Sequence, residues 1–280
     1  MQKRAIAVHD ISCVGRCSLT VALPVLSAAG LNTAIIPTAL LSTHTGEFSG
    51  YTHLDLSNQL RPIGDHLATL DLHYDTFYSG YLANGAQVEE VLHLMDSLCD
   101  EGTHIFVDPA FGDHGRMYSL MDASMPCEMR RLVSRAHTIV PNVTEASFLL
   151  DEQYPGDAAD EAVITDFCRR LLALGPHNVV ITDVNFRLGE TGIAILRRGM
   201  DEPLYLFHKR FDGLFHGTGD VFASFLLGSL MNDQPLEKAA KTALDLTHAA
   251  IVETLRDGEH LRYGMQFEKV LPLFWQRLNG

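Results

Sequence analysis

The chain has 280 residues, of which 46% are hydrophobic and 20% are charged. This composition is ordinary for a globular protein and excludes a chain that is disordered by composition. A formal net charge of −14 at pH 7 argues against nucleic acid or an anionic membrane as a partner, because both require a cationic protein surface. With no internal repeat or linker, we expect a single domain over residues 1–280.

The N-terminal segment and the cysteines indicate a cytoplasmic protein. Only four apolar residues precede His9, too few for the core of a signal peptide, and no stretch approaches the length of a membrane span. The five cysteines are an odd number and lack the paired spacing of a zinc site, so we expect reduced thiols.

Short apolar runs alternate with amphipathic helical stretches along most of the chain. Strands are predicted, in chain order, at residues 5–8, 33–37, 76–79, 105–108, 138–141 and 178–183. Helices are predicted between them at residues 18–29, 55–70, 86–100, 125–136 and 161–174. A hairpin of residues 192–197 and 203–208 follows, and then helices at 220–231, 236–255 and 265–276. Buried strands separated by helices form βαβ units, which predicts a mostly parallel sheet.

Polar residues gather after the predicted strands, and ligands bind beyond the carboxyl ends of the strands in open parallel sheets. The polar segments lie at residues 9–12, 41–46, 78–81, 108–113, 141–145 and 182–183. Each of them alone could be a turn or a helix cap. Six of them on one edge of one sheet predict a binding site.

The segment His216-Gly217-Thr218-Gly219-Asp220 precedes a long apolar helical pattern. Its two glycines allow a tight turn, and the unpaired amides and dipole of the helix N-terminus favour an anion there. Asp220 in the first turn is badly placed to bind phosphate but well placed to take a proton from an attacking hydroxyl. The alternative is a structural role, in which Asp220 only stabilises the first turn.

Asn142 and Glu145 have the spacing of a helix capping box, with Asn142 as the cap and Glu145 at the third position. The functional alternative is that Glu145, with Asp108 or Asp113, holds water ligands of a Mg²⁺ ion, which accepts few protein carboxylates and shares its shell with substrate phosphate.

Six motifs in chain order, spread over nearly the whole chain, resemble the ribokinase superfamily and, within it, the vitamin B6 (pyridoxal) kinases. Two of them, Asn142-x-x-Glu145 and Gly217-Thr218-Gly219-Asp220, are specific to the superfamily at this separation. The His-Thr-Gly of residues 44–46 and the Ser-Gly-Tyr of residues 79–81 point to the B6 branch. The other two motifs are residues 108–113 and 180–182.

The resemblance implies a three-layer α/β/α sandwich and ATP-dependent phosphorylation of the hydroxymethyl group of pyridoxamine, pyridoxal or pyridoxine. Asp220 would be the general base, and the amides of Gly217, Thr218 and Gly219 would form the anion hole. Such kinases are commonly homodimers, and a dependence on a monovalent cation is left open.

The resemblance also assigns residues to the nucleotide, the metal and the ring. ATP and its phosphates would contact Asp108, Asp113, Asn142, Thr182 and Asp183. Mg²⁺ would be held through Glu145 and Asp108. The pyridine pocket would be lined by Asp10, His44, Thr45 and Tyr81.

Asp10 departs from the pattern of the B6 branch, where many members carry a serine after the first strand. The related hydroxymethylpyrimidine kinases have an aspartate there, followed by a glycine-rich run, but this chain has only Gly15. A carboxylate accepts hydrogen bonds, so Asp10 favours a ring substituent that donates, such as the aminomethyl group of pyridoxamine. Hydroxymethylpyrimidine kinase is therefore the alternative enzyme, and a non-catalytic B6 carrier is the alternative outside catalysis.

Overall fold

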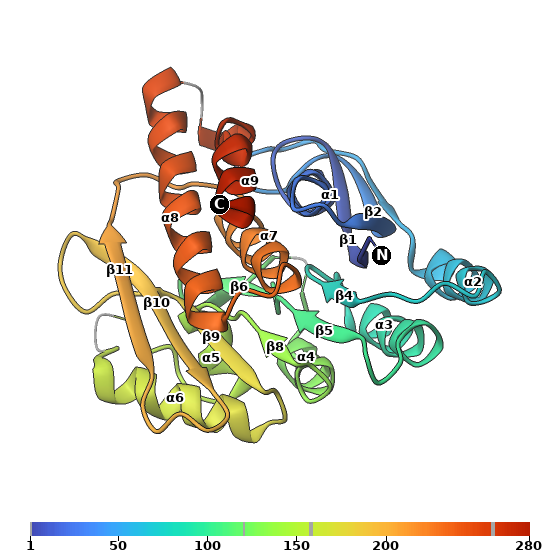
Figure 1. Ribbon diagram of the computed structural model, residues 1–280, viewed down its shortest axis with the longest axis horizontal. Coiled ribbons are helices and arrows are strands. Elements are labelled where there is room, and N and C mark those ends of the chain that lie inside the picture. The colour runs from blue at the N-terminus through green and yellow to red at the C-terminus, as the bar shows by residue number, and fades with distance from the viewer. Residues whose placement is uncertain (1, 120, 157–158, 259–260) are drawn as a thin grey trace.

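A computed structural model of the protein describes residues 2–119, 121–156, 159–258 and 261–280. Within these ranges nine strands form one sheet (Figure 1). Its order is β11 (Leu204–Lys209), β10 (Glu190–Arg197), β9 (Asn178–Val184), β8 (Thr138–Ile139), β5 (His104–Val107), β4 (Thr76–Ser79), β1 (Arg4–Val14), β2 (Asn32–Thr43) and β3 (His53–Asp55). The pairs from β9 through β2 are parallel, whereas β3, β10 and β11 add antiparallel edges. The mostly parallel α/β sheet is therefore confirmed.

Helices cover both faces of the sheet, as Figure 1 shows. One face carries α1 (Leu19–Ala28), α7 (Thr218–Met231), α8 (Leu236–Asp257) and α9 (Leu271–Asn279). The other carries α2 (Ser57–Ala68), α3 (Gly85–Leu98), α4 (Met125–Val133), α5 (Val143–Leu149) and α6 (Glu161–Ala173). Alternate residues of β1 enter the two cores, because successive strand side chains point to opposite faces. This arrangement is the expected three-layer sandwich.

The first two strands are longer than we expected. The parallel ladder of β1 and β2 continues to the pair of Val14 and Thr43, past the level at which β4 ends, and β3 pairs with this extension. Asp10 therefore does not follow the first strand, as we expected, but lies inside β1 at a register shift between His9 and Ile11. The shift is a local irregularity of the kind that redirects a side chain.

The C-terminal helix also differs from the expected range of residues 265–276. A 3₁₀ turn, η3 (Phe267–Val270), comes first and α9 follows it. Pro272 lies in the first turn of α9, where its missing N–H costs no helical bond, so the helix begins beside it. A further 3₁₀ turn, η2 (Leu261–Tyr263), and the two-stranded ribbon of β6 (Gly112–Asp113) and β7 (Arg116–Met117) complete the fold. No helix in the described ranges is both long and apolar enough to cross a bilayer.

Three histidines form a row at the amino ends of the central strands, the edge opposite the carboxyl ends. The rings of His104 and His137 stack with centroids 5.2 Å apart, and His177 meets His137 edge-on at 5.3 Å. Burial lowers the pKa of His104 to about 4, and the charges of His137 and His177 add to this effect. The Nε2 atom of His104 lies 3.1 Å from the Thr138 hydroxyl oxygen. The folded protein therefore holds His104 as a neutral group.

We expect His104 to make stability depend on pH in the mildly acidic range. Because the unfolded histidine titrates near 6.5, the unfolded state binds more protons below that pH, so stability falls as the pH drops toward the folded pKa of about 4. The loss attributable to His104 should reach about 2 kcal/mol between pH 6.5 and 5. Urea unfolding of wild type, His104→Gln and the exposed control His66→Gln measures it. Equal pH slopes for wild type and His104→Gln would contradict the assignment.

Candidate active site

The turn before α7 opens its amides to a free space, as the sequence predicts. Gly217 is the N-cap residue in a left-handed conformation with φ 76°, and a Cβ there would lie 2.1 Å from the carbonyl oxygen of Arg16. Only glycine fits that position. Gly219 is exposed, and a Cβ on it would meet nothing within 4 Å. The Thr218 hydroxyl donates to the carbonyl of Phe215 at 2.5 Å. The first amides of a helix have no partner within the helix, so those of this turn are available to an anion.

Asp220 lies in the first turn of α7 and is partly exposed. The N-cap position belongs to Gly217, and no side chain forms the capping hydrogen bond. Burial among neighbouring residues raises the pKa of Asp220 to about 7; the backbone N–H of Ser18 opposes this rise and the charge of Asp10 adds to it. A carboxyl group with a pKa near neutrality is suited to accept a proton at physiological pH.

Ser18 connects two of the site carboxyl groups, a role that the sequence did not predict. Its hydroxyl hydrogen-bonds to the carboxyl group of Asp10, and its backbone N–H faces Asp220. Its φ of 50° is unusual for a residue other than glycine, and such strain concentrates at functional sites. Asp10 is 6% exposed, and burial raises the pKa of its carboxyl group. The segment before α1 therefore holds Asp10 and Asp220 near one another.

The capping box at α5 is present and extends to a second loop. The Asn142 side chain accepts from the Glu145 amide at 2.9 Å, and the Glu145 carboxylate accepts from the Asn142 amide at 2.8 Å. The same carboxylate also accepts from the amides of Phe111 at 3.1 Å and Gly112 at 3.4 Å. The structural interpretation of this motif is confirmed, and Glu145 additionally fixes the loop after β5.

Asp108 and Glu145 are crowded, buried carboxyl groups with exposures of 6% and 3%. Burial raises the pKa of both; the charge of Asp220 adds to the effect on Asp108, and that of Asp108 to the effect on Glu145. Among the described residues, no group of three or more histidine, cysteine, aspartate or glutamate side chains is arranged to hold a metal. The two carboxyl groups are oxygen donors of the kind that Mg²⁺ accepts beside water and a ligand.

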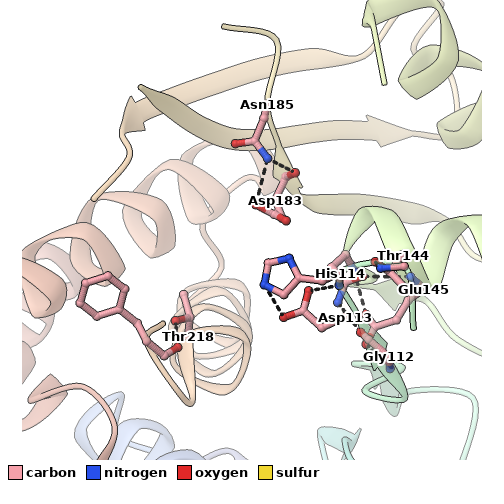
Figure 2. Close-up of polar contacts among 11 residues, drawn as sticks. Gly112, Asp113, His114, Thr144, Glu145, Asp183, Asn185 and Thr218 are labelled. Atoms are coloured by element: carbon pink, nitrogen blue, oxygen red, sulfur yellow. Dashed lines mark hydrogen bonds and ion pairs between the residues drawn. The ribbon is translucent and has the colours of Figure 1, made fainter. Parts of the chain in front are cut away.

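Asp113 and Asp183 lie near one another at the opposite end of the site, and Thr182 precedes Asp183 in β9. Burial raises the pKa of Asp183; the amide of Asn185 opposes the rise with a 3.0 Å hydrogen bond, and the charge of Asp113 adds to it. Figure 2 shows the Asp183 side chain directed toward the side where His114 and Asp113 lie. The Thr182 amide donates to Pro141 at 2.9 Å, which carries the parallel pairing past the end of β8.

Tyr81 lies on the same side of the site as Asp10. Burial raises the pKa of Tyr81 to about 12, and the charges of Asp10 and Tyr51 add to the effect. The ring of Tyr118 is 6.3 Å from that of Tyr81. Tyr118 is 40% exposed overall. Partial burial of its phenol, followed by the charges of Glu145 and Asp113, raises the pKa of Tyr118. Tyr118 was not predicted, and the only signal in the sequence is an aromatic residue after a glycine-rich loop.

His44 is used to hold loops together. Its Nδ1 accepts from the amide of Gly46 at 3.1 Å, and its Nε2 lies 2.6 Å from the carbonyl of Arg262. These partners require a neutral ring that is protonated on Nε2, which agrees with the lowering of its pKa by burial. Because both nitrogens of His44 already have hydrogen-bond partners, His44 could contact a ring substrate only through the face of its imidazole ring. Thr45 is exposed beside it.

The groups at this edge of the sheet match the needs of one kind of reaction. A helix N-terminus open to an anion, a neighbouring carboxyl group of near-neutral pKa and buried carboxyl groups at the strand ends fit phosphoryl transfer. The model of the family described as phosphomethylpyrimidine kinase matches residues 22–264. The chain is an ATP-dependent small-molecule kinase with a ribokinase-like fold. It belongs to the phosphomethylpyrimidine kinase family.

The chain is also similar to individual kinases of known sequence or structure. A pyridoxine/pyridoxal/pyridoxamine kinase of Bordetella pertussis is 26% identical, covering 87% of each chain. The crystal structure of pyridoxal kinase from Lactobacillus plantarum has a TM-score of 0.90 at 30% identity, covering 99% of this chain and 98% of its own. A Bacteroides thetaiotaomicron protein assigned to the phosphomethylpyrimidine kinases, crystallised with pyridoxal, has a TM-score of 0.89 at 32% identity, covering 100% and 96%.

The turn before α7 can be tested with matched glycine substitutions. Gly219→Ala should keep or slightly raise stability, because alanine is the better helix former and its Cβ meets nothing. Its methyl group would nevertheless occupy the space in front of the amides, so kcat/KM for ATP should fall by about 10-fold or more, the equivalent of about 1.4 kcal/mol. Gly102→Ala, on an exposed turn before β5, is the control. Unchanged ATP kinetics in Gly219→Ala would show that no phosphate lies at this turn.

Proposed function

We propose that this kinase transfers the γ-phosphoryl group of ATP to the hydroxymethyl group of a vitamin B6 vitamer, with Asp220 as the general base. The main support is the position of Asp220, whose carboxyl group, with a pKa of about 7, stands beside the open amides of Gly217–Gly219. The Bordetella and Lactobacillus relatives are named as kinases of vitamin B6 vitamers, and the Bacteroides structure contains pyridoxal; both observations support the ring substrate.

In the proposed reaction, Asp220 accepts the proton of the substrate hydroxyl as its oxygen attacks the γ-phosphorus. A new phosphorus–oxygen bond forms, the bond to the bridging oxygen breaks, and ADP leaves. The amides of Gly217, Thr218 and Gly219, at the positive end of α7, stabilise negative charge on the transferring group. Positioning and charge stabilisation of this kind supply most of the rate in phosphoryl transfer.

Mg²⁺ fits the crowded carboxyl groups of this site. Asp108 would face the ion, whereas Glu145, whose oxygens already accept three amides, would act through water. When bound, the ion would neutralise charge on the phosphates. Asn142 and Asp113 would lie near the phosphates, and Thr182 and Asp183 near the rest of the nucleotide.

On the ring side, Asp10, Tyr81, His44 and Thr45 would line the pocket. The buried carboxyl group of Asp10 suits a donating ring substituent better than an aldehyde oxygen, since two acceptors repel. Pyridoxamine is therefore the proposed preferred vitamer. A site that hydrogen-bonds a substrate group discriminates strongly against analogues that lack it.

Hydroxymethylpyrimidine is the second candidate acceptor, favoured by the family match and by the same carboxyl group, which could accept from its ring amino group. A non-catalytic carrier is disfavoured, because it would need neither a base nor an anion-binding turn. Homodimer assembly and a cytoplasmic location stay predictions, and dependence on a monovalent cation stays open.

The base assignment predicts the effect of Asp220→Asn. Asparagine keeps the size of the side chain but cannot take the proton, so kcat should fall by about 10²–10⁴-fold while the vitamer still binds. Wild-type kcat/KM should fall as the pH drops below about 7, because Asp220 must be ionised to act. An ADP-release assay and vitamer titration measure both effects. Turnover by Asp220→Asn within a few-fold of wild type would rule out this base.

The proposed role of Asp10 predicts that this residue controls the preference among vitamers. In wild type, kcat/KM should be higher for pyridoxamine than for pyridoxal, and Asp10→Ser should narrow or reverse the difference. The same ADP-release assay with pyridoxamine, pyridoxal, pyridoxine and hydroxymethylpyrimidine measures it. Equal values for the two vitamers, or a preference that Asp10→Ser leaves unaltered, would refute the role of Asp10. A far higher value for hydroxymethylpyrimidine would make that ring the substrate.

A further inference from the structure

His216 lies directly before the open turn of residues 217–219, and its imidazole ring contacts three residues of another loop. The ring Nε2–H donates to the Glu47 carboxylate at 2.9 Å. The ring centroid lies 4.9 Å from that of His44, and the ring also packs against Gly46. Glu47 and His216 are 169 positions apart in the sequence, so only the folded chain brings the two loops together.

Gly46 is required by this contact rather than by its backbone conformation. A Cβ on Gly46 would lie 2.4 Å from Cε1 and 2.6 Å from Nδ1 of His216. Both distances are well inside van der Waals contact. The φ angle of Gly46 lies outside the left-handed region that favours glycine, unlike that of Gly217. The absence of a side chain at position 46 therefore allows the His216 ring to lie directly on the backbone of this loop.

The loop that His216 contacts is held at both ends. Glu47 has a φ of 59°, and such a conformation in a residue other than glycine persists only where surrounding contacts hold it. The ion pair with His216, whose side chain is 17% exposed, is one such contact. At the other end, Nε2 of His44 donates to the carbonyl of Arg262. Thr45 lies between these anchors and is itself exposed, so its position depends on the residues beside it.

We propose that His216 is a positioning residue, which holds Thr45 at a fixed place relative to the turn of residues 217–219. The proposal rests on the proposed function, in which Thr45 lines the ring pocket and this turn stabilises the transferring phosphoryl group. The ring substrate must reach from one to the other, because its hydroxymethyl oxygen attacks the phosphorus. A link between the two loops therefore favours the productive placement of the ring.

The substitution His216→Ala removes all three contacts. KM for the vitamer should rise about 10-fold, because the loop that carries Thr45 loses its support. KM for ATP should change little, since Gly217 stays packed against the carbonyl of Arg16 and keeps the turn in place. The melting temperature should also change little, because partly exposed ion pairs contribute little to stability.

The matched control is His73→Ala. It removes a histidine–aspartate pair, in which Nδ1 of His73 lies 2.8 Å from the Asp100 carboxylate, in the connections before β4 and β5 at the opposite edge of the sheet. Both KM values should stay at the wild-type level in this variant. An unchanged vitamer KM in His216→Ala, or equal increases of the vitamer and ATP KM values, would overturn the proposal.

The substitution Gly46→Ala tests the same contact from the other loop. Its methyl group would press on the His216 ring, so Gly46→Ala alone should raise KM for the vitamer. In the His216→Ala background the methyl group would meet no imidazole ring, so it should add little. Residues in contact give such non-additive effects, whereas independent effects multiply. A double variant in which the two effects multiply would contradict the direct contact.

Wild type assayed in parallel with pyridoxamine, pyridoxal, pyridoxine and hydroxymethylpyrimidine separates the proposed function from the positioning role. The vitamer KM is measured with the ring that wild type phosphorylates best. Phosphorylation of none of these rings would overturn the proposed function and the positioning role with it. If wild type phosphorylates a ring and His216→Ala leaves the KM for that ring unchanged, only the positioning role fails.

Discussion

Four carboxyl groups crowd together at one edge of the sheet, and three of them are shielded from water by the packing around them. Asp10, Asp220, Asp108 and Glu145 form a chain in which each group feels the charge of the next. Burial of charge is costly unless it is satisfied by hydrogen bonds or an opposite charge. The protein supplies some of these hydrogen bonds through backbone amides, since the Glu145 carboxylate accepts hydrogen bonds from three of them. The carboxyl charge that these amides do not compensate is suited to a divalent ion and to the positive end of the α7 dipole.

The fold brings these groups together because parallel strands end at a common edge. The loops after β5 and β8 deliver Asp108 and the N-terminus of α5, and α7 begins against the segment before α1. The contact between Gly217 and Arg16 allows no side chain at the turn. Close packing of backbone against backbone therefore sets the position of the helix N-terminus, and with it the position of Asp220.

The same arrangement explains why several site groups are individually unfavourable. Ser18 has an unusual backbone conformation, and Asp108 is buried beside other acids. Such features cost stability, and proteins keep them where the chemistry uses them. A phosphoryl-transfer site needs a base that is poised near neutrality and donors that face an incoming anion. Both require groups that the fold leaves only partly satisfied until ligands bind.

Features that depend on short spacing can be predicted from the sequence. The turn of residues 217–220, the capping box of Asn142 and Glu145, and the alternation of strands and helices are local, because one helical turn or one strand sets each of them. The position of Asp10 inside β1 and the use of both His44 nitrogens to bind loops follow only from the folded structure. The burial of a site carboxyl group, its pKa and the charges around it depend on segments that are far apart in the chain, such as β1 and α7. Their proximity follows from packing, which no local spacing encodes.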